Sequence, residues 1–132
     1  MFKWIFQIFH IGETPTARIG RLGESASVKY LKSEKSMRII KRNARIKKQE
    51  MDIIALDGDT LVFIEVKTRS QDAIVDGYYS ASSKNKMQNL RKFASAYISA
   101  MRKKPRTWRF DAIEIRHDNS KIISISHFEN IG

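Results

Sequence analysis

The stretch QEMDIIALDGDTLVFIEVKTR, residues 49–69, decides the fold of this 132-residue chain. Two apolar runs, 51–56 and 61–66, flank an Asp-Gly-Asp triplet at 57–59. Such a triplet favours a tight turn because Gly tolerates positive φ, so the pattern predicts two strands joined as an antiparallel hairpin. The second run is apolar on both faces up to Ile64, which is typical of a central strand.

Apolar spacing outside the hairpin predicts two helices and three more strands. Residues 24–35 and 84–104 have helical periodicity, and Pro105 ends the second helix. Residues 14–23, with two glycines, are expected to form a non-helical lead-in, and 70–83 a loop. Strands are predicted at 37–46, 108–116 and 121–128. The order helix, three strands, helix, two strands predicts an α/β domain with a mixed sheet flanked by helices.

The composition favours a single domain that binds a polyanion. The chain has 25 Lys and Arg against 14 Asp and Glu, a net charge of +11 and a pI near 10.1, which suit DNA or RNA. A ribosomal or membrane-surface role is the alternative. The absence of cysteine excludes disulfides and thiolate metal sites and fits the cytoplasm. The nucleic-acid-binding candidates come from the two most basic stretches and are Arg38, Lys41, Arg42, Arg45, Lys84, Lys86 and Arg91.

The chain begins with an apolar segment, MFKWIFQIFHI at residues 1–11. It is too short to span a bilayer, and Gln7 and His10 interrupt it in a way that a signal peptide would not favour. We therefore expect no membrane partner. The domain division predicted is an apolar extension at 1–17 and a single domain at 18–132.

Four charged residues form the candidate site. Glu65 and Lys67 are two apart on a predicted strand, so they share a face, and the hairpin brings Asp52 close to opposite Glu65. Two carboxylates that repel each other favour a cation between them, and Mg²⁺ (or Mn²⁺) prefers oxygen ligands. Lys67 would position an attacking water or offset charge, and Glu24 would hold a further water or metal. The alternative is that Glu65 and Lys67 form a simple ion pair on an exposed face.

The sequence resembles the YraN-type family of uncharacterised bacterial proteins, which are similar to Holliday junction resolvases of the PD-(D/E)XK nuclease superfamily. The resemblance rests on GRLGESASVKYL (20–31), RIIKRNAR (38–45), residues 49–69 and WRFDAIEI (108–115). Gln49 and Ser36 stand where the family usually has Gly. The resemblance implies a restriction endonuclease-like core, with Glu24, Asp52, Glu65 and Lys67 as catalytic residues and Asp52 and Glu65 as metal ligands. It also makes a homodimer a candidate assembly.

Other polar and aromatic residues receive weaker assignments. His10, His117 and His127 are expected to lie outside the site, without a metal role. Asp111 is expected to be structural, and Trp108, Phe110 and Phe128 to belong to the core. Tyr78 and Tyr79 would either stack on unpaired bases or pack.

Three functional hypotheses remain open from the sequence. The first is a Mg²⁺-dependent endonuclease that cleaves phosphodiester bonds, with DNA favoured over RNA and with selectivity for branched or single-stranded structure. The second is a protein of the same fold that binds nucleic acid without turnover. The third is an assembly protein that docks a protein partner through its basic surface and apolar N-terminal segment.

Overall fold

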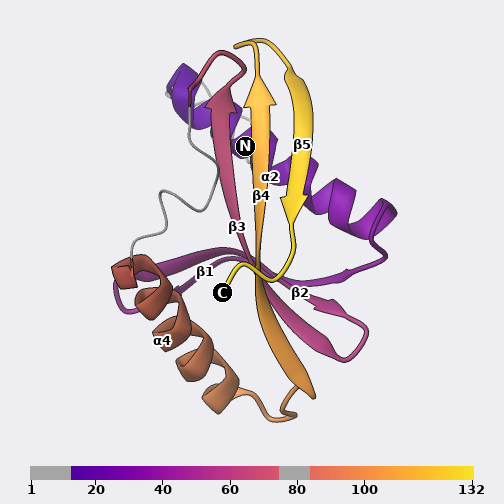
Figure 1. The fold of residues 1–132 in the computed structure, drawn as a ribbon, viewed down its shortest axis with the longest axis vertical. Helices are drawn as coiled ribbons and strands as arrows, with labels where there is room; N and C mark the ends of the chain where they lie inside the picture. The colour runs from indigo at the N-terminus through magenta and orange to yellow at the C-terminus, as the bar shows by residue number, and fades with distance from the viewer. Residues whose placement is uncertain (1–12, 75–83) are drawn as a thin grey trace, which may run out of the picture.

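The computed structural model describes residues 13–74 and 84–132 (Figure 1). Its elements follow one another along the chain in the predicted order of helix, three strands, helix and two strands. They are α2 (Pro15–Ser33), β1 (Arg38–Ile46), β2 (Gln49–Asp57), β3 (Thr60–Ser70), α4 (Lys84–Ala100), β4 (Thr107–His117) and β5 (Ile122–Phe128).

The five strands form one mixed sheet in the order β1-β2-β3-β4-β5. Strands β3 and β4 are parallel, and the other neighbours are antiparallel. Asp57 pairs with Thr60 across a two-residue turn, and Gly58 in that turn has a φ of 60°. The predicted hairpin is therefore confirmed, together with the predicted α/β fold class, a mixed sheet flanked by helices.

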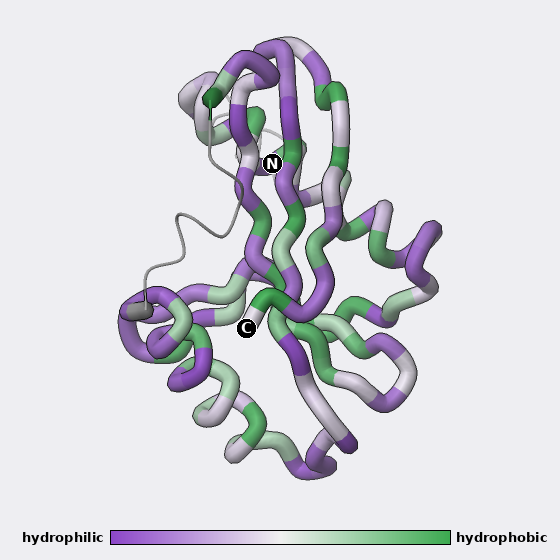
Figure 2. The backbone as a smooth tube through the Cα atoms, viewed as in Figure 1, coloured by the Kyte–Doolittle hydropathy of each residue, from purple (hydrophilic) through white to green (hydrophobic). Residues whose placement is uncertain are grey.

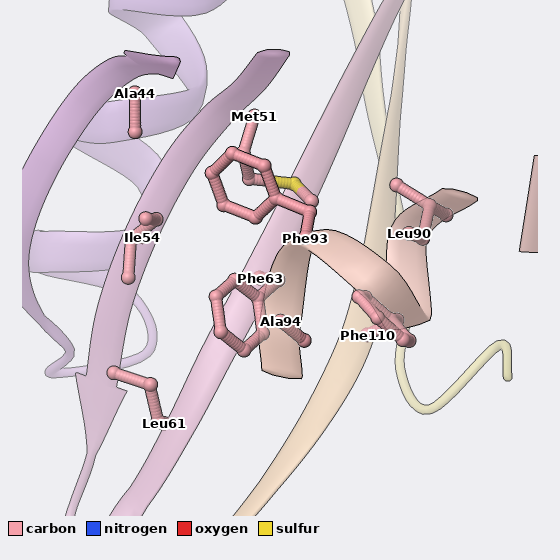
Figure 3. Close-up of a cluster of buried hydrophobic side chains, with 9 residues drawn as sticks. All are labelled: Ala44, Met51, Ile54, Leu61, Phe63, Leu90, Phe93, Ala94 and Phe110. Atoms are coloured by element: carbon pink, nitrogen blue, oxygen red, sulfur yellow. The ribbon is translucent and has the colours of Figure 1, made fainter. Parts of the chain in front are cut away.

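The two helices pack on opposite faces of the sheet, and each covers its own apolar cluster. Helix α4 contributes Leu90, Phe93 and Ala94 to a cluster that includes Phe63 of β3 (Figure 3). Helix α2 contributes Leu31 to the other, which includes Ile64 of β3. Hydrophobic residues are concentrated in the middle of the sheet, and the upper part of β3 and β4 is more hydrophilic (Figure 2).

The prediction of a non-helical lead-in at 14–23 is wrong, because α2 begins at Pro15. Thr14 caps the helix by accepting a hydrogen bond from the Ala17 N–H at 3.0 Å, and proline is tolerated in a first turn. Gly23 is buried where α2 touches β3, and a Cβ added there would lie 2.4 Å from Oγ1 of Thr68. The glycine permits this close approach, and it does not end the helix.

Two further predictions need smaller corrections. Helix α4 ends at Ala100 and not at 104, and the Lys104 ammonium donates to carbonyls at that end, those of Ile98, Ser99 and Met101. Phe110 is in the core as predicted, but the side chain of Trp108 is exposed. It packs edge-on against Phe63 and Phe110 with one face open to solvent.

Some predictions fall outside the described residues. These include Tyr78, Tyr79, His10 and most of the predicted N-terminal extension. Within residues 13–74 and 84–132, no helix is both long enough and apolar enough to cross a membrane.

Candidate active site

The sheet opens between β2 and β3 where the candidate residues begin. Ile53 and Ile64 form the last pair at this end of the β2–β3 ladder, and beyond them β2 pairs with β1 while β3 pairs with β4. The two strand pairs diverge from this point (Figure 1). Oδ2 of Asp52 accepts a hydrogen bond of 2.8 Å from the Val66 N–H, so its carboxylate occupies the opening beside β3. The predicted proximity of Asp52 to the Glu65 strand therefore exists in the fold.

Glu24 approaches the opening from α2. Its carboxylate lies 3.4 Å from Nε of Arg42 on β1, and the same guanidinium donates to the Ser25 hydroxyl. Glu24 and Asp52 both line one cavity of about 520 Å³. Helix α2 reaches this position because Gly23, the residue before Glu24, allows it to lie against β3.

Glu65 and Lys67 lie on the α4 side of β3, on the face that also carries Phe63. Oε1 of Glu65 is 3.4 Å from Nζ of Lys67 and 2.7 Å from Nζ of Lys86 on α4. The Glu65 side chain is 17% exposed, against 41% for Lys67 and 28% for Lys86. A half-buried carboxylate thus faces two ammonium groups.

Of the three carboxylates in the candidate site, that of Asp52 is the least compensated by neighbouring charge. Burial raises its pKa, the nearby carboxylates of Glu24 and Glu65 raise it further, and the Val66 N–H and Lys67 only partly oppose this. Within the part of the chain that the structure describes, Asp52 forms no ion pair. A cation placed beside it would therefore relieve a repulsion that the fold itself creates.

The described residues offer a metal only a partial ligand set. No three side chains of His, Asp or Glu among residues 13–74 and 84–132 come close enough together to hold an ion. Two carboxylates completed by water are a normal arrangement for Mg²⁺, which keeps several waters of its own. The donors of Asp52 and Glu65 fit that ion and would fit a transition metal that needs imidazole or thiolate poorly.

The cavity beside Glu24 and Asp52 also contains residues that the sequence prediction missed. His117 and Asn119, at the end of β4, line it together with Thr68 of β3. His117 thus lines the same cavity as Glu24 and Asp52. Only the parallel pairing of β4 with β3 brings these residues here, and no local spacing in the sequence signals a parallel partner.

The predicted nucleic-acid-binding residues that the structure describes lie on several parts of the surface. Arg42 and Lys86 contact the acidic residues from opposite sides of the sheet. Lys41 and Arg45 line a separate hollow of about 510 Å³ beside Tyr97 and Met101 of α4. Arg38 and Arg91 are exposed on β1 and α4, and the Lys84 side chain lies outside the described residues.

Asp111 and His127 belong to a hydrogen-bond network outside the candidate site. Oδ2 of Asp111 lies 2.8 Å from Nε2 of His127, whose Nδ1 lies 3.1 Å from the Tyr30 hydroxyl. Arg109 and the Asn130 N–H also donate to Asp111. Burial alone would raise the pKa of Asp111, but these donors outweigh it and hold the pKa below its usual value. The network ties β4 to β5, as expected for a structural aspartate.

Comparison with known proteins identifies the family. A model of the uncharacterised protein family UPF0102 matches residues 23–115. A UPF0102 protein of Mycolicibacterium vanbaalenii is 33% identical over 91% of this chain and 98% of its own length. Another, from Chlorobium phaeobacteroides, is 42% identical over 85% of this chain and 91% of its own length. The chain belongs to the UPF0102 family, the YraN-type family that the sequence resembles.

One solved structure is also similar. It is SfsA of Pyrococcus furiosus in complex with Ca²⁺, which is 18% identical, with a TM-score of 0.45 over 83% of this chain and 63% of that one. A similarity of this size is too low to support an inference about activity.

Proposed function

We propose that this protein is a Mg²⁺-dependent endonuclease that hydrolyses phosphodiester bonds in DNA. The observation that carries the proposal is the state of Asp52, a half-buried carboxylate that Glu24 and Glu65 repel and that has no cation partner among the described residues. Asp52 and Glu65 would hold the ion. The resemblance to PD-(D/E)XK nucleases supports the same roles for these positions.

Each site residue has a defined task in this reaction. When bound, Mg²⁺ would polarise the phosphoryl oxygen and acidify a water. In the hydrolysis, the oxygen of a water would form a new P–O bond and the bond from phosphorus to the leaving sugar oxygen would break. The attacking water would give up one proton to the solvent, and the leaving oxygen would take one up from it. Lys67 would orient the water or offset the charge that develops on the phosphate. Glu24 would hold a second water through the cavity that it shares with Asp52.

Basic residues on both sides of the acidic residues support a nucleic-acid substrate. Arg42 and Lys86 are close enough to the acids to contact a phosphate beside the site, and the exposed Arg38 and Arg91 would add phosphate contacts farther out. The cytoplasmic location and the homodimer expected from the sequence stay predictions.

The test is cleavage of labelled single-stranded, duplex, flap and four-way-junction DNA, and of matched RNA, in Mg²⁺ or Mn²⁺. Asp52→Asn retains an oxygen that can accept from Val66 and removes only the charge. Glu50→Gln, an exposed charge change two residues away on β2, is the matched control. We expect cleavage by the wild type and by Glu50→Gln, and a loss of at least about 100-fold in Asp52→Asn.

The competing function is binding of nucleic acid without cleavage. Lys67 and Lys86, the two lysines beside Glu65, support it because they would hold a phosphate without any metal. Salt-sensitive binding of nucleic acid in EDTA, with no cleavage of any substrate in either metal, would reject the nuclease. It would leave a protein that binds nucleic acid without turnover.

A further inference from the structure

The cavity beside the acidic residues extends far along β3. Its near part is lined by Asp52 and Val66, and its far part by His117. His117 pairs with Ser70, four residues after Val66, so the two parts are about 13 Å apart along the strand. In Figure 1 the N-terminal half of α2 and the ends of β3 and β4 lie together in the upper part of the molecule. A volume of about 520 Å³ lies within the usual range of small-molecule sites.

The far wall of the cavity is held firmly in position. The Gln71 N–H donates to the His117 carbonyl at 2.7 Å, and Nη1 of Arg116 donates to the carbonyls of Ser70 and Ala73. Asp118 accepts hydrogen bonds from the Ser120 and Lys121 backbones in the turn that contains Asn119. The far part of the cavity is therefore preorganised.

His117 offers a hydrogen-bond donor to this cavity. The residue is 7% exposed, and its Nδ1 accepts from the Asn119 N–H at 3.1 Å, so the neutral ring carries its proton on Nε2. No group among the described residues pairs with that nitrogen. Among the described residues, every side-chain nitrogen or oxygen that is shielded from solvent has a hydrogen-bond partner. Since Nε2 has none, it must be accessible to solvent. Because His117 lines the cavity, its Nε2 is the candidate donor to a molecule bound there.

The lining of the cavity changes in character along its length. The carboxylates and the apolar side chain of Val66 stand at the near part. Uncharged polar groups stand at the far part, where Asn119 and Thr16 accompany His117 beside the apolar side chain of Ile19. A cation beside the carboxylates would strengthen the binding of a phosphate at the near part. Neutral donors at the far part suit the ring nitrogen or carbonyl acceptors on the edge of a nucleobase.

We infer that this cavity is a subsite for one unpaired nucleotide adjacent to the scissile phosphate, and that His117 donates a hydrogen bond to its base. The inference rests on the proposed nuclease function and narrows its substrate class. A base that enters this cavity leaves the helical stack, so the substrate that this subsite would select has a single-stranded or frayed nucleotide at the cleaved bond.

The direct test is a titration of the ¹⁵N-labelled wild-type protein in EDTA, with the histidine ring nitrogens followed by NMR. The two probes are deoxyadenosine 5′-monophosphate and 2-deoxyribose 5-phosphate, which lacks the base. We expect the Nε2 resonance of His117 to move with the first probe only. The ring of His127, held by Asp111 and Tyr30, is the internal control and should stay in place. Equal shifts with both probes, or no shift of His117, would overturn the assignment.

A second measurement uses two substitutions of His117. His117→Phe keeps the ring volume and removes the donor, whereas His117→Gln retains one. In EDTA, we expect His117→Phe to weaken binding of a single-stranded oligonucleotide about tenfold and to leave blunt duplex binding unchanged, with partial recovery in His117→Gln. Equal weakening of both substrates would count against the subsite.

Both measurements are made without metal, so they are independent of cleavage. Nucleotide-dependent shifts in a protein that never cleaves DNA would reject the nuclease and keep the subsite. Cleavage by a protein whose His117 ignores the nucleotide would keep the nuclease and reject the subsite.

Discussion

Nζ of Lys86 on α4 lies 2.7 Å from Oε1 of Glu65 on β3, closer than the 3.4 Å between Glu65 and Lys67. The ammonium closest to the proposed metal ligand therefore comes from a helix and not from the E-x-K motif. A positive charge at this distance competes with any cation that Glu65 would bind.

This relationship predicts that Lys86→Met strengthens metal binding. The gain should be about three- to tenfold in Mn²⁺ affinity, because the partly exposed ion pair that is lost is worth roughly 1 kcal/mol. Titration calorimetry without nucleic acid measures it, and Lys86→Arg, which retains the charge, should behave like the wild type. Lys92→Met removes an exposed charge from the same helix and serves as the control. Unchanged or weaker Mn²⁺ binding in Lys86→Met would show that Lys86 does not compete.

The raised pKa of Asp52 predicts that Asp52→Asn stabilises the fold at neutral pH. Ionised Asp52 is less favourable in the folded protein than in the unfolded chain, because burial and the charges of Glu24 and Glu65 disfavour it. The folded protein therefore has its full stability, as far as Asp52 is concerned, below the unfolded pKa of about 3.9, where Asp52 is protonated in both states. It loses stability as the pH rises through the higher folded pKa of Asp52. The substitution removes this penalty at pH 7, by the order of 1 kcal/mol.

Denaturant unfolding at pH 7 and in the acidic range below pH 3.9 checks the prediction. The advantage of Asp52→Asn should shrink at the lower pH, where Asp52 is protonated in both states. Glu50→Gln should show neither the gain nor its pH dependence, because Glu50 is exposed. An Asp52→Asn protein that is less stable than the wild type at pH 7 would mean that its interaction with Val66 outweighs the repulsion.

The contact between α2 and β3 predicts opposite effects for two glycines of one helix. A Cβ at Gly23 would lie 2.4 Å from Oγ1 and 3.3 Å from Cγ2 of Thr68, so Gly23→Ala should destabilise the protein by about 1–3 kcal/mol. Gly20 has no atom within 4 Å of an added Cβ, and Gly20→Ala should stabilise by up to about 1 kcal/mol through helix propensity.

Thermal unfolding of the two glycine variants measures the difference. Thr68→Ala removes both atoms that the new Cβ would meet, so it should recover much of the loss when combined with Gly23→Ala. If Gly23→Ala were as stable as Gly20→Ala, the two elements would not be in close contact.

The parts of the fold that can be predicted from the sequence are those determined by residues close together in the chain. Gly58 and the apolar runs beside it are enough for the hairpin, and the two-residue spacing of Glu65 and Lys67 is enough for their shared face. From the hairpin register follows the position of Asp52 near them. These features depend on the period of a strand and the geometry of one turn.

The features that the sequence prediction missed have long-range causes. Gly23 lowers helix propensity locally, yet it lies in a helix because β3 passes close to it, and only the tertiary contact with Thr68 shows this. His117 joins the cavity through the parallel pairing of β3 and β4, which α4 makes possible by crossing between them. Lys86 meets Glu65 for the same reason, since the packing of α4 on the sheet is not encoded in its own periodicity.

The Asp111 network predicts that Asp111 and Asp57, which both pair with Arg109, contribute very differently to the stability of the fold. Asp111 and Asp57 both accept from Arg109, but the Asp111 side chain is fully buried and that of Asp57 is 43% exposed. Asp111→Asn leaves the charge of Arg109 partly uncompensated in the interior, and its one amide oxygen replaces two carboxylate oxygens that accept from Arg109, Asn130 and His127. We expect it to cost about 3–5 kcal/mol, whereas Asp57→Asn should cost about 1 kcal/mol or less. Urea unfolding compares the two directly, and amide exchange of β5 and of Asn130 should accelerate only in Asp111→Asn. Equal losses in both variants would mean that Arg109 acts as a surface pair, and that Asp111 does not anchor β5 to β4.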